Sequence, residues 1–450
     1  MLNRRGITGG QTGPRVLIRA ASVADHRSEI APAALLMEGD RILDVGAPQT
    51  VGEVSDARII DAQSDVLLPG LVNAHAHLDL SGPGPVAYCG DFEQWLESVL
   101  DIRWSSDEQD IRAAVKKGAE LSLAGGTVLI GDISGMPHVP QFETLRDTPL
   151  GGVSYQEFFG LGDFQGDSIK SMEDTLARMG GKHGKLVCGL TPHAPYTCGA
   201  ELIQAAVRFG VPVAIHVSES LEEQEFMASG TGAFRKLSEL LKAWNDGVVI
   251  PGCHAVDFTV DQVRHRSAGL PASSIQMIHL NYMEPRHVDI LAKAGVSPVY
   301  CPRASAYFGH PVSGSHPYRA MLDHDIAVSL GTDSLICLDT PDRISILDEM
   351  RFLFGRDATA PHTLLKMATV NGAHSLGFED DRLFEFTAGN RVAGLLAVGV
   401  DEGTPGLLNV LKSTTAPRWI LRPVSWDPGG RRDESVNDEE RLWCQPVDVP

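Results

Sequence analysis

The feature that most constrains the fold is an alternation of short apolar runs with amphipathic helical stretches through most of the chain. Alternation of this kind indicates βα units, and eight units predict an α/β protein built as a (β/α)8 barrel. In such a barrel the chemistry lies at the C-terminal ends of the strands. The eight runs expected to be strands are Leu71–Leu78, Thr127–Ser134, Val153–Gly160, Leu186–Pro192, Val211–Ser218, Ser274–Leu280, Val296–Pro302 and Ile326–Thr332.

The helix expected after the first strand illustrates the pattern. Ser106, with Gln109 three residues later, predicts a capping box at its start. Apolar residues then recur at helical spacing from Ile111 to Leu121, and the pair Gly125-Gly126 supplies the stop.

The two ends of the chain have a different pattern, of short apolar runs separated by turn residues. Residues 15–70 together with 383–425 are therefore expected to form one small β-sandwich domain, which flanks a barrel of residues 71–382. Residues 1–14 remain as an N-terminal extension. Residues 426–450, rich in charge, are expected to be a solvated tail.

Composition bounds the partners and the compartment. The 450 residues include 38 Lys and Arg against 58 Asp and Glu, a net charge of −20, which disfavours nucleic acid and anionic membranes as partners. No uncharged apolar run reaches roughly 18 residues, so no membrane span is expected. Seven scattered cysteines without a C-x-x-C pair fit a reducing compartment, and we expect a cytoplasmic protein.

Two histidines at the end of the first predicted strand are the most informative residues. His75 and His77 are two positions apart, so their side chains leave a strand on the same side and can bind one metal ion. Three further candidates end later strands: His216 the fifth, His279 the sixth and Asp333 the eighth. For any single histidine the alternative is a core or surface residue without function. Three of these histidines with the carboxylate predict a zinc or ferrous site with a position for water.

With these residues in place, the sequence resembles the amidohydrolase superfamily from about residue 15 to 425. Pro69-Gly-Leu-Val-Asn-Ala-His-Ala-His-Leu is similar to the first-strand signature of the superfamily, and His216, His279 and Gly331-Thr-Asp follow in the expected order. The resemblance implies a distorted (β/α)8 barrel, a TIM barrel, with a small β-sandwich from both chain ends.

The fourth predicted strand separates two branches of this superfamily. It ends in Thr191-Pro-His-Ala-Pro-Tyr, without the lysine that marks the two-metal members. The resemblance is therefore to the mononuclear deaminase branch. It implies one divalent metal ion, with zinc as the first choice and iron or manganese as alternatives, held by His75, His77, His216 and Asp333.

The same branch has a glutamate three residues after the fifth-strand histidine, matched here by Glu219. Replacing an aromatic amine by oxygen requires a group that protonates the ring nitrogen, and a carboxyl group can do so. A metal ion would lower the pKa of its water to roughly 7, and Asp333 and His279 would take up the proton of that water. A solvated acid at a helix start is the alternative for Glu219.

The substrate implied by the resemblance is an adenine-type nucleoside. The segment around His193 is similar to that of S-adenosylhomocysteine, methylthioadenosine and aminofutalosine deaminases, which implies that His193 contacts the nucleoside. Its alternative is a turn residue between prolines. Arg303 is a candidate for binding a substrate carboxylate or phosphate, with a salt bridge at the barrel rim as the alternative. Trp95 and Trp104 are candidates for a wall of the pocket, with helix packing as the alternative.

Other functions remain open at this point. Within enzymes, the alternatives are deamination of guanine or cytosine and chlorohydrolysis of a triazine. A non-catalytic barrel scaffold is the alternative from a different class. The expected partner is a small molecule, and a homo-oligomer is left open because family members are often dimers or larger.

Overall fold

The structure is a computed structural model that describes residues 15–423, except 180–181, 184 and 401–405. The described chain forms two compact units, residues 71–380 and residues 15–70 with 381–423. The end predicted for the barrel, residue 382, lies two residues beyond the end of the larger unit. The predicted extension at 1–14 and tail at 426–450 lie outside the described residues.

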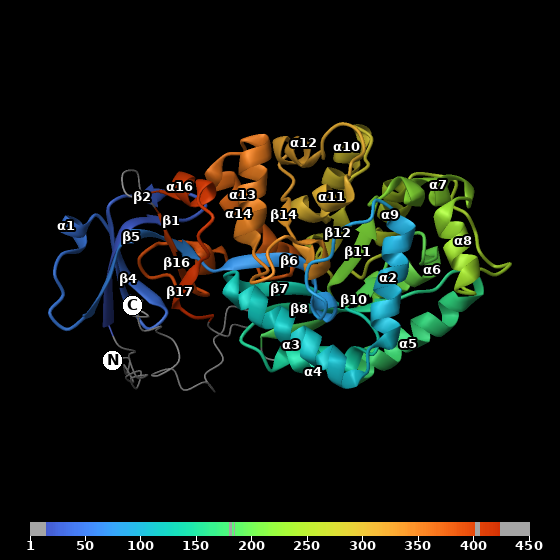
Figure 1. The fold of residues 1–450 in the computed structure, drawn as a ribbon, viewed down its shortest axis with the longest axis horizontal. Coiled ribbons are helices and arrows are strands. Elements are labelled where there is room, and N and C mark those ends of the chain that lie inside the picture. The colour runs from blue at the N-terminus through green and yellow to red at the C-terminus, as the bar shows by residue number, and fades with distance from the viewer. Residues whose placement is uncertain (1–14, 180–181, 184, 401–405, 424–450) are drawn as a thin grey trace, which may run out of the picture. The chain divides into compact units, whose positions relative to one another are not determined.

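The larger unit is built on a parallel sheet whose strands follow one another in sequence order (Figure 1). Every residue of β7 and β8 is buried, as expected for parallel strands covered on both faces. The strands are β6 (Leu71–His77), β7 (Thr127–Ser134), β8 (Gly151–Phe158), β10 (Leu186–Pro192), β11 (Val213–Val217), β12 (Ile275–His279), β13 (Ser297–Tyr300), β14 (Ser329–Leu330) and β15 (Asp333–Ser334), with β9 (Lys182–His183) antiparallel to β10.

The sheet closes through an interrupted last strand. β14 pairs with β13, while β15 pairs with β6, and only two residues separate β14 from β15. Within that interval the backbone nitrogen of Gly331 donates to Tyr300 on one side, and that of Thr332 donates to His75 on the other. A Cβ on Gly331 would lie 2.8 Å from that of His75, so glycine permits this approach. The predicted (β/α)8 barrel is confirmed, with its eighth strand split in two.

Helices lie outside these strands in Figure 1. They are α2 (Phe92–Ser105), α3 (Glu108–Ala124), α4 (His138–Arg146), α5 (Gln165–Met179), α6 (Ala200–Arg208), α7 (Leu221–Ser229), α8 (Ala233–Leu240), α9 (Ala255–Val263), α10 (Arg286–Ala294), α11 (Pro302–Phe308), α12 (Tyr318–Asp323), α13 (Ile346–Asp357), α14 (Pro361–Met367) and α15 (Val370–Ser375). Short 3-10 turns occur at Leu78–Ser81, Gly162–Phe164, Ala272–Ser274 and Leu335–Cys337.

The helix α3 shows why these segments form where they do. Its capping box uses Asp107 and Asp110, one residue later than the predicted pair, because Asp107 accepts from the backbone nitrogens of Gln109 and Asp110. A carboxylate at this position also interacts favourably with the positive end of the helix dipole. The helix ends at Gly125, as its sequence predicts.

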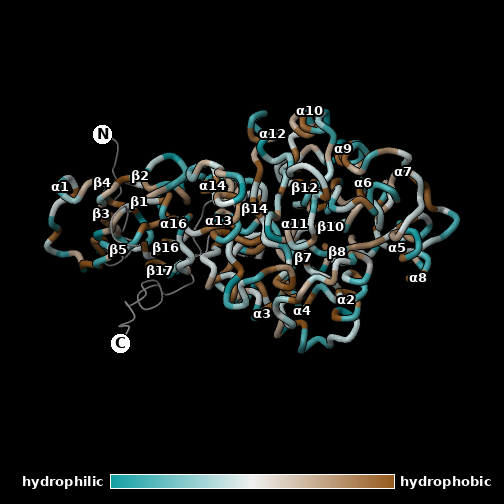
Figure 2. The backbone as a smooth tube through the Cα atoms, turned by 45° about the horizontal axis from the view of Figure 1, so that its top comes forward, coloured by the Kyte–Doolittle hydropathy of each residue, from teal (hydrophilic) through white to brown (hydrophobic). Residues whose placement is uncertain are grey.

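The smaller unit combines both parts of the chain in one seven-stranded sheet of order β17-β16-β5-β1-β3-β4, with β2 beside β1. The expected domain from both chain ends is therefore present, and hydrogen bonds join all its strands in a single sheet. In both units hydrophobic and hydrophilic stretches alternate along the backbone (Figure 2). The elements are β1 (Arg15–Ala24), β2 (Glu29–Ile30), β3 (Ala33–Glu38), β4 (Arg41–Gly46), α1 (Pro48–Val51), β5 (Arg58–Pro69), the 3-10 turn Asp381–Phe384, β16 (Leu395–Gly399), α16 (Leu407–Lys412) and β17 (Arg418–Leu421).

Among the described residues, no helix combines the length and the apolar character needed to cross a bilayer.

Candidate active site

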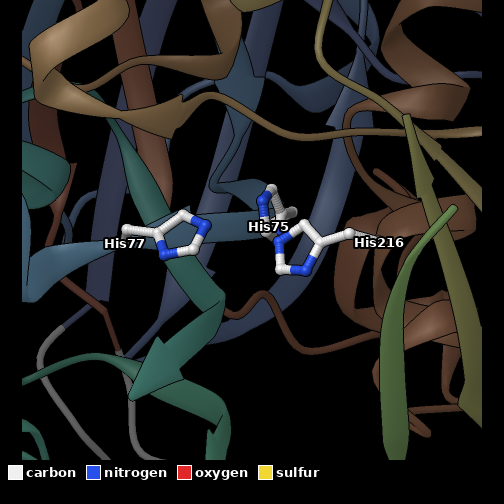
Figure 3. Close-up of side chains that lie close together, drawn as sticks. All are labelled: His75, His77 and His216. Carbon is white, nitrogen blue, oxygen red and sulfur yellow. The ribbon is translucent and has the colours of Figure 1, made fainter. Parts of the chain in front are cut away.

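Two imidazoles project together from the end of β6. His75 and His77 lie on the same side of the strand, and their ring centroids are 4.9 Å apart with the rings nearly perpendicular. His216, at the end of β11, lies 5.1 Å from the ring of His75 and 5.5 Å from that of His77 (Figure 3). Each of the three offers a ring nitrogen, and these nitrogens all lie within 4.8 Å of one another. Strands that are far apart in sequence thus place three nitrogen donors around one point.

A second group of donors shares His75 with the first. His279, at the end of β12, and Asp333, at the start of β15, lie with His75 such that their donor atoms are within 4.8 Å of one another. Asp333 Oδ1 is 3.6 Å from His77 Nε2 and 3.9 Å from His75 Nε2. All five residues predicted around the metal are therefore brought together.

The unpaired nitrogens of this cluster test whether a metal ion fits. His75 is fully buried, yet neither of its ring nitrogens has a hydrogen-bond partner among the described residues, and the same holds for His77 Nδ1. Buried polar atoms are rarely left without a partner. Burial lowers the pKa of His75, His77 and His216, so their rings are neutral and keep a lone pair. Neutral imidazoles and a carboxylate are the donors that a divalent transition metal ion prefers, and the residues fit such an ion.

The backbone at the site is locally unfavourable. Ser218, His279 and Asp333, which are not glycines, have φ values of 59°, 73° and 61°. Residues other than glycine adopt this left-handed region at a cost, and such residues concentrate at functional sites. Here the conformation occurs where β11 and β12 end and where β15 begins, which is where the strands deliver their donor side chains.

Glu219 lies beside the cluster of donors. Its Oε1 is 3.6 Å from His279 Nε2. Burial raises the pKa of this carboxyl well above its usual value, and the charges of Asp333 and Glu223 raise it further. Burial therefore favours the protonated form of Glu219, which can donate a proton to a bound molecule.

Glu223 holds Glu219 in place, a role that the sequence analysis did not assign. Its two carboxyl oxygens accept from the backbone nitrogens of Ser218 and Glu219, at 2.8 and 2.7 Å. The signal for it was present as Ser220-x-x-Glu223, the pattern of a capping box at the start of α7. Its side chain reaches past the N-cap residue to the two residues before it.

An ion-pair cluster around Arg103 was also missed. Arg103 donates through Nε to Asp79 at 3.0 Å and through Nη1 to Glu157 at 2.7 Å. Burial is the largest single influence on Glu157 and raises its pKa, but Arg103, His193 and His216 together outweigh burial and hold the pKa below its usual value. Arg103 Nη2 has no hydrogen-bond partner in the described part of the chain. No pattern along the chain indicates this cluster, because its members come from α2, β8 and the turn after β6.

The four residues predicted to bind substrate lie in different surroundings. His193 is next to the metal-site histidines, with its ring centroid 5.0 Å from that of His216 and its Nδ1 2.8 Å from Thr197 Oγ1. Arg303 forms ion pairs with Asp339 and with the buried Glu349, which is the rim salt bridge considered as its alternative.

The two tryptophans both belong to α2. Trp95 packs on Phe92 and Phe308, at centroid distances of 5.8 and 4.7 Å. Trp104 is 67% exposed. The substrate contacts of Arg303, Trp95 and Trp104 stay predictions.

Comparison with known proteins identifies the class. The model of the amidohydrolase family matches residues 66–382, and the chain belongs to this family. Its curated relatives include the 5-methylthioadenosine/S-adenosylhomocysteine deaminase of Carboxydothermus hydrogenoformans, 24% identical over 81% of this chain and 80% of that protein. They also include the 5'-deoxyadenosine deaminase of Methanothrix thermoacetophila, 27% identical over 79% of this chain and 80% of that protein.

Among solved structures, the fold is similar to that of Helicobacter pylori aminofutalosine deaminase in complex with methylthio-coformycin. The TM-score is 0.74 at 19% identity, over 92% of this chain and 99% of that chain. An adenosine deaminase from Xanthomonas campestris with bound zinc gives a TM-score of 0.69 at 18% identity, covering 94% of both chains.

Proposed function

We propose that the chain is a metal-dependent deaminase of adenine-type nucleosides such as S-adenosylhomocysteine, methylthioadenosine or aminodeoxyfutalosine. In this reaction water replaces the 6-amino group of the adenine ring, which becomes hypoxanthine, and ammonia leaves. The observation that carries the proposal is Glu219, a largely buried carboxyl with a raised pKa, whose Oε1 lies 3.6 Å from His279 Nε2 and next to the donor cluster. The deaminase names of the relatives support the same reaction.

Within this proposal, His75, His77, His216 and Asp333 hold one divalent ion, and we favour zinc over iron or manganese because three imidazoles and a carboxylate suit it. When bound, such an ion supplies Lewis acidity and lowers the pKa of a water molecule. Asp333 and His279 would then be placed to accept and hold the proton of the attacking water. The backbone carbonyl of His279 accepts a hydrogen bond from His316 Nε2 at 2.7 Å, and this bond holds the main chain of His279 in place.

Glu219 transfers the proton to the substrate. Its carboxyl group donates to the ring nitrogen next to the carbon under attack, and then assists the departing ammonia. A carboxylate at this position could not donate, so the raised pKa is what the step requires. His193, beside His216, contacts the nucleoside.

The expected setting of the enzyme is the cytoplasm. All six cysteines in the described part of the chain are free thiols, which agrees with a reducing compartment. The assembly we expect, if the chain does not act as a monomer, is a homo-oligomer.

A substrate panel tests the proposed function. The purified protein, loaded with zinc, iron or manganese, is assayed for ammonia release and for the ultraviolet shift from adenine to hypoxanthine. The panel holds adenosine, 5′-deoxyadenosine, 5′-methylthioadenosine and S-adenosylhomocysteine, with guanine, cytosine and atrazine as competitors. We expect turnover of adenine nucleosides. Turnover of a competitor with silence across all adenine nucleosides would overturn the proposal.

A further inference from the structure

A cavity of about 390 Å³ adjoins the proposed catalytic residues on one side. It is lined from α2, from the segments that follow β8 and β10, and from α8 and the residues after it. His193 and Arg103 are part of this lining. A ring contact of 5.6 Å joins His193 to Tyr196 in the cavity wall, and one of 5.0 Å joins His193 to His216. The cavity therefore shares His193 with the proposed substrate site.

The wall of this cavity is mostly apolar. Four aromatic rings line it, namely Phe159, Phe164, Tyr196 and Phe234, and leucines of α2 and α8 complete it. Tyr196 and Phe234 are stacked with centroids 3.9 Å apart. Phe159 and Phe164 are 45% and 43% exposed, so large rings at the opening lack cover from the protein. Concave apolar surface of this kind is typical of a ligand site.

The charged side chains around the cavity do not complement a zwitterionic ligand group. None of the described lining residues is Asp or Glu, so a ligand ammonium group would find no carboxylate in the wall. Arg103 already pairs with Asp79 and Glu157 through Nε and Nη1, and among the described residues only its Nη2 lacks a partner. Lys242, an exposed residue, is the other cation of the lining. A charged amino-acid group placed here would lose its hydration with at most partial compensation.

From this position and this chemistry, and resting on the proposed function, we infer that the cavity binds the substituent on the ribose 5′ carbon and selects a large, uncharged apolar or aromatic group. A cavity of about 150 Å³ with apolar walls can hold benzene. The volume here is larger, so a methylthio group leaves much of the apolar wall exposed to water, whereas an aryl group covers it. The amino-acid part of S-adenosylhomocysteine is disfavoured.

Two thioethers of adenosine test this inference, because they share the linkage and differ only in the group beyond the sulfur. We expect kcat/KM for 5′-phenylthio-5′-deoxyadenosine to exceed that for S-adenosylhomocysteine at least tenfold. Equal values, or a preference for S-adenosylhomocysteine, overturn the inference while deamination itself stands. Absence of turnover for every adenine nucleoside overturns the proposed function and the inference with it.

Substitutions on α8 test whether the expected preference for the phenylthio nucleoside arises from this cavity. Leu237→Trp narrows the cavity, and we expect the kcat/KM of the phenylthio nucleoside, relative to that of 5′-deoxyadenosine, to fall at least tenfold. Leu240→Trp is the matched control, since Leu240 lies on the same helix, is 69% exposed and is not part of the lining. It should leave that ratio within twofold of the wild-type value.

A second variant that narrows the cavity keeps the test possible if the first variant does not fold. Leu96→Trp approaches the cavity from α2, and it should lower the same ratio if Leu237→Trp does not fold. Metal content and melting temperature report on the integrity of each variant. A folded Leu237→Trp or Leu96→Trp variant whose kcat/KM ratio is unchanged contradicts the inference.

Discussion

The backbone carbonyl of His193 accepts two hydrogen bonds from His216, one from its backbone nitrogen and one from its Nδ1, both 2.9 Å long. The second bond fixes the tautomer of His216, because Nδ1 carries the proton and Nε2 keeps a lone pair. The residue proposed to contact the nucleoside therefore also orients a proposed metal ligand, and it does so through its main chain.

Removal of His216 is expected to empty the metal site. His216→Ala deletes one of three imidazole donors, and we expect metal content to fall from about one ion per chain to below half, measured by plasma mass spectrometry after dialysis. Deaminase activity should fall at least 100-fold. His265→Ala, an exposed histidine outside the site, is the control and should keep both values. An unchanged metal content in His216→Ala would disprove the assignment.

His193→Ala separates substrate binding from metal binding. The variant keeps the backbone carbonyl that orients His216, so metal content should stay at the wild-type level. The imidazole is lost, and kcat/KM for adenine nucleosides should fall about 10-fold to 100-fold, as expected for one polar substrate contact. Loss of metal, with little change in the kinetics of reloaded enzyme, would mean that the side chain supports the site rather than the substrate.

Glu219→Gln removes the proton donor while keeping the shape of the side chain. We expect kcat to fall about 10² to 10⁴-fold with metal content unchanged, because general acid catalysis contributes a factor of that size. Glu222→Gln, three residues later on α7, is the matched control and should keep most of the activity. Wild-type kcat in Glu219→Gln would show that another group supplies the proton.

Glu223→Gln tests a positioning role. In the wild type the two carboxyl oxygens of Glu223 accept hydrogen bonds from two backbone N–H groups. In the variant, the N–H group of the amide would face one of these donors instead. Unfolding free energy should drop by about 1 to 3 kcal/mol. Because Glu219 is displaced, kcat should fall about tenfold while KM changes little. A loss of stability without a loss of kcat would leave Glu223 a structural residue only, and Glu225→Gln, exposed on the same helix, provides the comparison.

Acid sensitivity is expected to involve His254, far in sequence from the active-site residues. Burial, together with the neighbouring His287, lowers its pKa to about 4, and its Nδ1 caps α9 by accepting from the Val256 backbone nitrogen. The unfolded chain binds this proton near pH 6.5 and the folded chain only near pH 4, so stability is lost as pH falls through that window. His254→Asn keeps an acceptor for the cap without this titration.

The measurement for His254 is urea denaturation at pH 7 and pH 5. Between these values the variant should lose about 1 kcal/mol less than the wild type, after allowance for the partial exposure of the side chain. Equal losses would show that His254 does not contribute to acid destabilisation.

Local pattern was sufficient to predict most of the barrel. The bounds of β7 and β10 coincide with their predicted ranges, since β-branched and apolar runs ended by turn residues favour strands. The predicted strand 153–160 lies two residues later than β8, which begins at Gly151. The eighth strand was expected to be continuous, and it is split because Gly331 and Thr332 bond to strands on opposite sides.

The candidate site was predictable to the extent that its residues end strands. The four histidines lie at strand ends, and Asp333 begins the second part of the split eighth strand. The geometry of a parallel barrel brings such residues together. Arg103 and its partners Asp79 and Glu157 have no such signature. Their pairing depends on how α2 folds back over the strand ends, which spacing in the sequence does not encode.

By itself the sequence determined the period of its strands and helices, the order of the strand-end donors and the chemical type of each donor, because these depend on local pattern and residue identity. Only the tertiary structure decided which of these groups share a site, which are neutral and which are already paired. Arg303 and Glu219 show the difference. Both are ionisable residues in the sequence, but the fold engages Arg303 in ion pairs and raises the pKa of Glu219 beside His279. Distances and desolvation arise only when separate segments meet.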